Sequence, residues 1–138
     1  MIDVRPNHEN GYLYLLVSEP FSLDELYQLL LNSPNAFVGW PAVLDLRQVR
    51  LDRITETDIR RHLMKKSSLG GAKTSVPCAY VVEGVKAQAV VRMATVMSEL
   101  ASISKDEDML VTEDLEEATR WVTASGAAVD AKRRYSRG

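Results

Sequence analysis

The sequence is short of several features, and each shortage excludes a class of protein. The 138 residues include a single cysteine, Cys78, so no internal disulfide can form. No stretch has the roughly 18 consecutive apolar residues of a membrane-spanning helix. The first five residues lack the basic and apolar regions of a signal peptide. We therefore expect a cytoplasmic protein with no transmembrane segment.

The sequence also lacks an excess of either charge. It has 17 Lys and Arg against 19 Asp and Glu, a net charge of −2, so overall charge predicts no specific nucleic-acid partner. A hydrophobic content of 46% is ordinary for a globular protein. The length predicts one domain over residues 1–125, followed by a flexible basic tail at 126–138.

Hydrophobic periodicity alternates between strand and helix along the chain. Strands are expected at 2–5, 12–17, 42–46, 76–82 and 109–111, with a turn at Asn10-Gly11 between the first two. Helices are expected after caps at Ser22, Thr55, Gly84 and either Thr112 or Asp114. The order β-β-α-β-α-β-α-β-α predicts an α/β fold. Its five-stranded sheet is mostly parallel, with an N-terminal antiparallel hairpin and four helices.

Two helix starts have the spacing of a capping box, in which the cap and the third helical residue bond each other's backbone. These pairs are Ser22 with Glu25 and Thr55 with Asp58. The first helix is expected to end at Asn32-Ser33-Pro34-Asn35, and the second at Gly70-Gly71.

The long helix after Gly84 carries apolar residues on more than one face. A stripe with helical spacing predicts its core-facing side: Val85, Ala89, Met93, Val96, Met97 and Leu100. A second margin extends beyond it: Ala87, Val90, Val91 and Ala94. This margin indicates either packing against a partner subunit, as in a homodimer, or the lining of a pocket.

The element order and one segment give the chain a family resemblance. Asp45-Leu46-Arg47 is followed by Val49, and the last helix contains Glu116-Glu117-Ala118-Thr119-Arg120-Trp121-Val122. Over roughly residues 2–122 the chain resembles the STAS superfamily of sulfate-transporter and anti-sigma-factor-antagonist domains. It is nearer the variant group related in fold to CRAL-TRIO lipid-binding domains. The resemblance implies an STAS-like sandwich that regulates by binding a partner protein.

The chain departs from the family at the regulatory phosphorylation site. The resemblance places the Asp-Ser-Ser or Asp-Ser-Thr run of regulatory members at Arg53-Ile54-Thr55, so isoleucine stands where the serine would be. We therefore expect partner binding without the usual serine switch. Thr55 and Thr57 remain candidate phosphorylation sites, although Thr55 is also explained as a helix cap.

The strongest charge feature is the segment from Arg47 to Lys73. It holds eight Lys and Arg against three acids, an excess of five positive charges. The loop after the third strand and the second helix are predicted to form the partner-binding face, through Arg47, Arg50, Arg53, Thr55, Arg61 and Lys65. The alternative is a solvated helix face whose late cations favour the helix dipole.

Three other patterns point to structure more than to chemistry. His8 and His62 have no nearby second ligand, so we predict no metal and no cofactor. Gly70-Gly71-Ala72-Lys73-Thr74 lacks the spacing of a phosphate loop. Acidic residues cluster between Glu99 and Glu117, where they complement the basic segment or occupy a loop and a helix start.

The sequence leaves two functions open. The first is a non-catalytic intracellular interaction module that binds a protein through the basic face. The second is a carrier or sensor of a small apolar or lipid-like ligand, with Met64, Met93 and Met97 lining its cavity. An enzyme is not expected, because no nucleophile–base pair, metal set or paired carboxylates can be placed together.

Overall fold

The computed structural model describes residues 1–32, 37, 39–68 and 76–136, with side chains to residue 125. The strands are β1 (Ile2–Asn7), β2 (Tyr12–Ser18), β3 (Ala42–Gln48), β4 (Cys78–Val81) and β5 (Met109–Thr112). The helices are α1 (Leu23–Leu31), α2 (Glu56–Ser67), α3 (Val85–Leu100) and α4 (Leu115–Ser136). Two 3-10 turns are η2 (Leu51–Arg53) and η4 (Asp106–Asp108).

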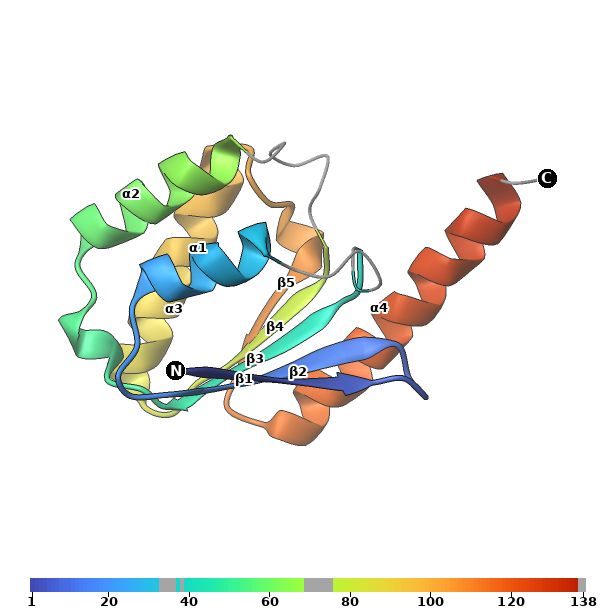
Figure 1. Ribbon diagram of the computed structural model, residues 1–138, viewed down its shortest axis with the longest axis horizontal. Coiled ribbons are helices and arrows are strands. Elements are labelled where there is room, and N and C mark those ends of the chain that lie inside the picture. The colour runs from blue at the N-terminus through green and yellow to red at the C-terminus, as the bar shows by residue number, and fades with distance from the viewer. Residues whose placement is uncertain (33–36, 38, 69–75, 137–138) are drawn as a thin grey trace.

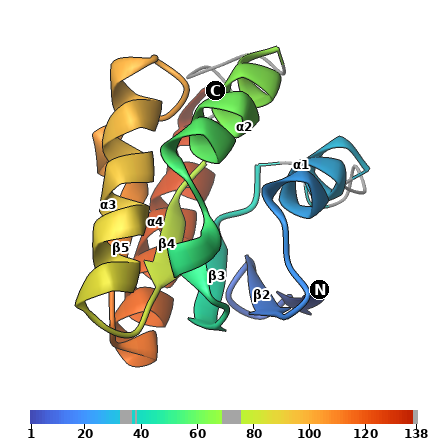
Figure 2. The same ribbon diagram turned by 90° about the vertical axis from the view of Figure 1, so that its left-hand side faces the viewer.

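The strands form one mixed sheet in the order β1-β2-β3-β4-β5. The pair β1–β2 is antiparallel, and the remaining pairs are parallel. The strand order advances in one direction, so right-handed crossovers place α1, α2 and α3 on the same face of the sheet. Helix α4 returns across the opposite face (Figures 1 and 2). The predicted α/β fold with five strands and four helices is confirmed.

The two faces of the sheet have separate cores because side chains alternate along each strand. On the face covered by the first three helices, Leu15, Val17, Leu44 and Leu46 pack with Val91 of α3. On the other face, Val43 and Val81 pack with Ala118 and Val122 of α4. Any residue of β3 can therefore be assigned to one face by whether its number is even or odd.

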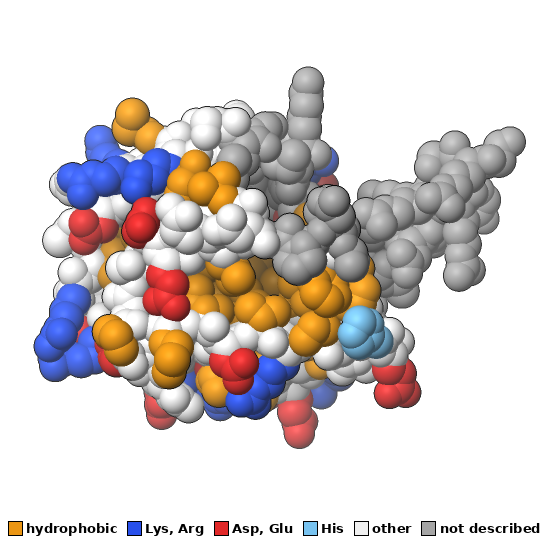
Figure 3. Space-filling model, in the orientation of Figure 1, with side chains coloured by type: hydrophobic (Ala, Val, Ile, Leu, Met, Phe, Trp, Pro, Cys, Tyr) orange, Lys and Arg blue, Asp and Glu red, His pale blue; other side chains and the backbone are white. Residues whose placement is uncertain are grey.

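Helix α1 packs more loosely than the other two helices on its face. Its cap Ser22 accepts a hydrogen bond from the Glu25 amide at 3.3 Å, but the Glu25 carboxylate lies 3.0 Å from the Met1 amino nitrogen. None of its residues is buried, although Leu26 and Leu29 contact the core. Hydrophobic side chains gather in a hollow between α1 and the hairpin of β1 and β2 (Figure 3).

The predicted core face of α3 is wrong in part: Met93 and Met97 pack against the core, but the other members of the stripe are exposed. Val85, Val96 and Leu100 are 84%, 53% and 79% exposed, whereas Val91 and Ser98 are buried. The expected second margin, with Ala87, Val90 and Ala94, packs against the core together with these two methionines. Both faces are apolar, so periodicity alone could not decide which one faces the sheet. The smaller side chains allow closer approach of the helix.

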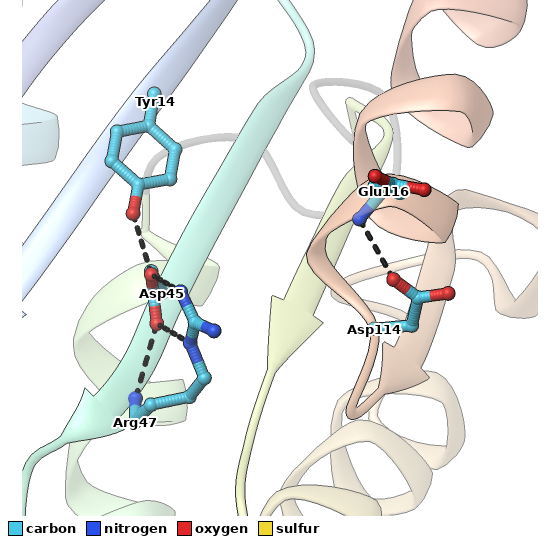
Figure 4. Close-up of polar contacts among 5 residues, drawn as sticks. All are labelled: Tyr14, Asp45, Arg47, Asp114 and Glu116. Carbon is cyan, nitrogen blue, oxygen red and sulfur yellow. Dashed lines mark hydrogen bonds and ion pairs between the residues drawn. The ribbon is translucent and has the colours of Figure 1, made fainter.

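Helix α4 begins as predicted and extends further than predicted. Asp114 Oδ1 accepts a hydrogen bond from the Glu116 amide at 2.9 Å, which caps the helix (Figure 4). Thr112 supports this turn through the Asp114 amide at 3.1 Å. The helix continues to Ser136, through most of the stretch predicted as a flexible tail. The glycines expected to end α2, Gly70-Gly71, lie outside the described residues.

Candidate functional site

The structure divides the predicted partner-binding residues between two faces of the sheet. Arg47 follows Asp45 at a spacing of two in β3, so both side chains lie on the face of α4. Arg50, Arg53, Arg61 and Lys65 line one groove on the other side, next to α1. Arg47 therefore does not belong to the same surface as the other four.

Arg47 is held by a buried carboxylate. Its Nε and Nη2 lie 2.9 and 2.8 Å from the two oxygens of Asp45, which is 1% exposed. The Tyr14 hydroxyl of β2 donates to the same carboxylate at 2.5 Å, and the Arg47 amide donates at 3.2 Å (Figure 4). Burial of a charge is tolerated here because every oxygen has a donor.

The titration of this cluster follows from its contacts. Burial acts to raise the pKa of Asp45, but hydrogen bonds from Arg47 and Tyr14 outweigh it and lower that pKa. The hydrogen bond with Asp45 raises the pKa of Arg47 above its ordinary value. Burial, with the Asp45 charge, raises the pKa of Tyr14. The cluster is thus an ion pair in which both carboxylate oxygens of Asp45 accept hydrogen bonds, and it links β2 to β3.

The groove lies where the loop before α1 meets η2 and the start of α2, and it has a volume of about 460 Å³. Glu19 joins its two sides, since its carboxylate accepts from the Arg50 amide at 2.8 Å and from the Phe21 amide at 3.1 Å. The hydrogen bond from Arg50 is the main reason that the pKa of Glu19 is lowered. Phe21, Leu23 and Ile54 supply apolar lining.

Not all cations of the groove are available to a partner. Lys65 of α2 lies 3.2 Å from Asp24 of α1 and 5.7 Å from the centre of the Tyr27 ring. Arg50 lies 3.6 Å from Asp52. Among the described residues, neither Arg53 nor Arg61 has an ion-pair partner within 4.0 Å. Lysine and arginine side chains are visible over α2 and the η2 turn (Figure 3).

The capping box at Thr55 is confirmed. Thr55 Oγ1 accepts from the Asp58 amide at 3.1 Å, and Asp58 Oδ2 accepts from the Thr55 amide at 3.0 Å. These bonds with Thr55 lower the pKa of Asp58. The preceding Ile54 packs against the cluster that contains Ile59, as expected for a hydrophobic staple. Thr55 and Thr57 are both exposed on the first turn of α2.

His62 also reaches the groove, which the sequence did not predict. Burial, aided by the charges of Lys66 and Lys65, lowers the pKa of His62 to about 4. Its Nδ1 is buried and has no hydrogen-bond partner among the described residues. Burial likewise raises the pKa of the Cys78 thiol to about 11. At neutral pH the histidine is uncharged and the thiol is protonated.

A second, apolar cavity of about 110 Å³ lies under α1 and α2, lined by residues such as Leu26, Leu44, Leu63, Tyr80 and Ala94. It adjoins the groove, because Phe21, Leu23, Ile54 and His62 line both. The three predicted methionines do not line it. Met64 is 75% exposed because it lies on the outer face of α2. Met93 and Met97 pack beside a cluster of Ile59, Leu63 and Ile103. The cavity is thus built from side chains of all three helices on this face of the sheet and of the strands beneath them.

No family model, curated protein or solved structure matches this chain. Within the described residues, no group of three or more His, Cys, Asp and Glu is placed to hold a metal ion. No helix in the described part is long and apolar enough to cross a membrane.

Proposed function

We propose that the protein is a non-catalytic interaction module, STAS-like in type, which binds an acidic segment of a partner protein in the groove between α1 and α2. The observation that carries this proposal is the position of Arg53 and Arg61. Both line the groove, and neither has an ion-pair partner within 4.0 Å among the described residues. The charges of Glu19 and Asp58, which also line the groove, attract Arg53 and Arg61 respectively from further away. Guanidinium groups form strong, directional hydrogen bonds with carboxylates.

The lining also indicates the kind of segment that fits. Phe21, Leu23 and Ile54 offer apolar contacts next to the two arginines. A peptide with alternating acidic and apolar side chains satisfies both parts of this surface. The ion pair between Lys65 and Asp24 links α1 to α2 at one side of the groove.

A catalytic role is less well supported by the same groove. Ser22, His62 and Asp24 all line it, which would suggest a hydrolytic triad by composition alone. However, the Ser22 hydroxyl caps α1 by accepting from the Glu25 amide. A histidine with a pKa of about 4 is also a weak general base at neutral pH. The geometry therefore favours binding over hydrolysis.

The proposal does not depend on phosphorylation. Thr55 uses its hydroxyl to cap α2, and the preceding position is Ile54. Thr55 and Thr57 are exposed at a helix start, where a phosphate would be electrostatically favourable. A phosphate there would compete with an acidic partner for Arg53, so modification would weaken binding.

The carrier hypothesis is less well supported by the cavity volume. The cavity under α1 measures about 110 Å³, which is smaller than the cavity of about 150 Å³ that takes up benzene in a well-studied protein. A fatty acyl chain therefore fits only if α1 moves. Native mass spectrometry after incubation with fatty acids tests this alternative, which predicts a bound acyl chain.

A peptide of alternating glutamate and leucine residues provides a direct probe of the groove. We expect it to bind the wild-type chain, with affinity that falls as salt rises. Arg53→Glu with Arg61→Glu should weaken binding at least tenfold, since each charge-assisted hydrogen bond contributes roughly 1.5–3 kcal/mol. Lys86→Glu with Arg120→Glu makes the same change in net charge elsewhere and serves as the matched control. Equal binding by both double variants contradicts the proposal.

A further inference from the structure

The outer face of α3 is an apolar stripe with nothing covering it among the described residues. Val85, Ala89, Val96 and Leu100 lie on this face, and three of them are more than half exposed. Their spacing places them along one line of the helix, opposite the buried Val91 and Ser98. Figure 2 shows α3 at the outside of the helical layer.

Two opposite charges lie beside this stripe. Arg92 and Glu99 are both exposed, and neither forms an ion pair with any described residue. They are seven residues apart, which is nearly two helical turns, so both lie on the same side of the stripe. Their separation along the axis is roughly 10 Å, too far for them to pair within one helix.

We infer that the stripe is the contact between two copies of this chain, with their α3 helices antiparallel about a two-fold axis near Val96. In such a pair, the flank of one helix that carries Arg92 and Glu99 faces the equivalent flank of the other helix, and the two sequences run in opposite directions. Arg92 of each copy then faces Glu99 of the other, which gives two equivalent ion pairs. The side chains of Val96 and Leu100 are removed from water between them.

A parallel pair does not give this complementarity. In a parallel two-fold pair, the flank with Arg92 and Glu99 meets the opposite flank, which carries Lys86 and Met93. The charge order on α3 therefore selects the antiparallel arrangement. One 16-residue helix offers less than the roughly 800 Å² per partner of a standard interface, so we expect a weak, concentration-dependent dimer.

Sedimentation velocity over a wide range of concentrations tests the charge pairing. The wild-type chain should shift from monomer to dimer as concentration rises. Arg92→Glu should raise the dissociation constant at least tenfold, because two glutamates then face each other at each ion pair. Adding Glu99→Arg to that variant should restore the dimer. Lys86→Glu, which reverses a charge on the same helix, should leave it unchanged.

Cysteine cross-linking in a Cys78→Ala background tests the orientation. Val96→Cys lies beside the proposed axis and should form a disulfide-linked dimer on mild oxidation. Val85→Cys is far from the axis and should not cross-link to itself. The inference is overturned if the wild-type chain stays monomeric at every concentration, if the double reversal fails to restore the dimer, or if Val85→Cys cross-links as readily as Val96→Cys.

Discussion

Replacing Arg47 by alanine should cost about 2–3 kcal/mol of folding free energy. The guanidinium makes two hydrogen bonds to the Asp45 carboxylate, which is 1% exposed. Breaking a buried ion pair typically costs about 3–5 kcal/mol. The expected loss is smaller here because the Tyr14 hydroxyl and the backbone amide of residue 47 still donate to Asp45. The Arg47 side chain is also 38% exposed, which weakens the lost attraction.

The loss should also depend on pH in a defined direction. The pKa of Asp45 is lowered in the folded wild type. Its ionised form therefore adds stability above the unfolded pKa of about 3.9, and this stability is lost as the pH falls through the lowered folded value. Without Arg47, burial acts to raise the pKa of Asp45, so the ionised carboxylate then destabilises the folded state. The gap between wild type and variant should be widest at neutral pH and narrow in acid.

Urea unfolding followed by tryptophan fluorescence measures both effects, since the chain contains Trp40 and Trp121. Adding Asp45→Asn to Arg47→Ala should recover most of the lost stability, because no buried charge is then left without a partner. The reasoning is refuted if Arg47→Ala lies within about 0.5 kcal/mol of wild type at neutral pH, or if the gap is the same at every pH.

Three further substitutions test other parts of the structure. Thr55→Ala removes the cap of α2 and should cost about 1 kcal/mol in urea unfolding, whereas Thr57→Ala should be within about 0.5 kcal/mol of wild type. The pKa of His62 is about 4 in the folded chain and about 6.5 in the unfolded chain, so on acidification the unfolded chain takes up the proton at a higher pH. The free energy of unfolding should therefore decrease as the pH is lowered from about 6.5 to about 4. His62→Leu should flatten that part of the stability profile, and an unchanged profile would contradict the assignment. Leu63→Ala should cost about 2–5 kcal/mol because Leu63 is buried, whereas Met64→Ala next to it should cost little. Equal effects would mean that α2 presents a different face to the core.

The local parts of the structure could be predicted from the sequence. The capping box of Thr55 and Asp58 involves residues three apart, so the sequence spacing alone predicts the hydrogen bonds between them. The order of strands and helices likewise followed from periodicity, and the handedness of crossovers then placed the first three helices on one face. The caps and the order of elements depend on neighbours along the chain, whereas the placement of three helices on one face also depends on the order of the strands in the sheet.

The non-local parts could not be predicted in the same way. The bond from Tyr14 to Asp45 joins residues 31 apart, and no spacing rule indicates it. The ion pair of Lys65 with Asp24 also joins two elements that are distant in sequence. The separation of Arg47 from the other predicted cations could be expected from the sequence, however. Asp45 and Arg47 alternate with Leu44 and Leu46 in a strand, which already separates Arg47 from the groove side.

The most direct test of the proposed interaction is a comparison of three chains binding the glutamate–leucine peptide by fluorescence anisotropy. The chains are the wild type, the Arg53→Glu/Arg61→Glu variant and the Lys86→Glu/Arg120→Glu control. If the groove between α1 and α2 is the binding site, the first variant loses binding at least tenfold and the control keeps it. If both variants bind as the wild type does, or both lose binding to the same extent, the groove is not the site.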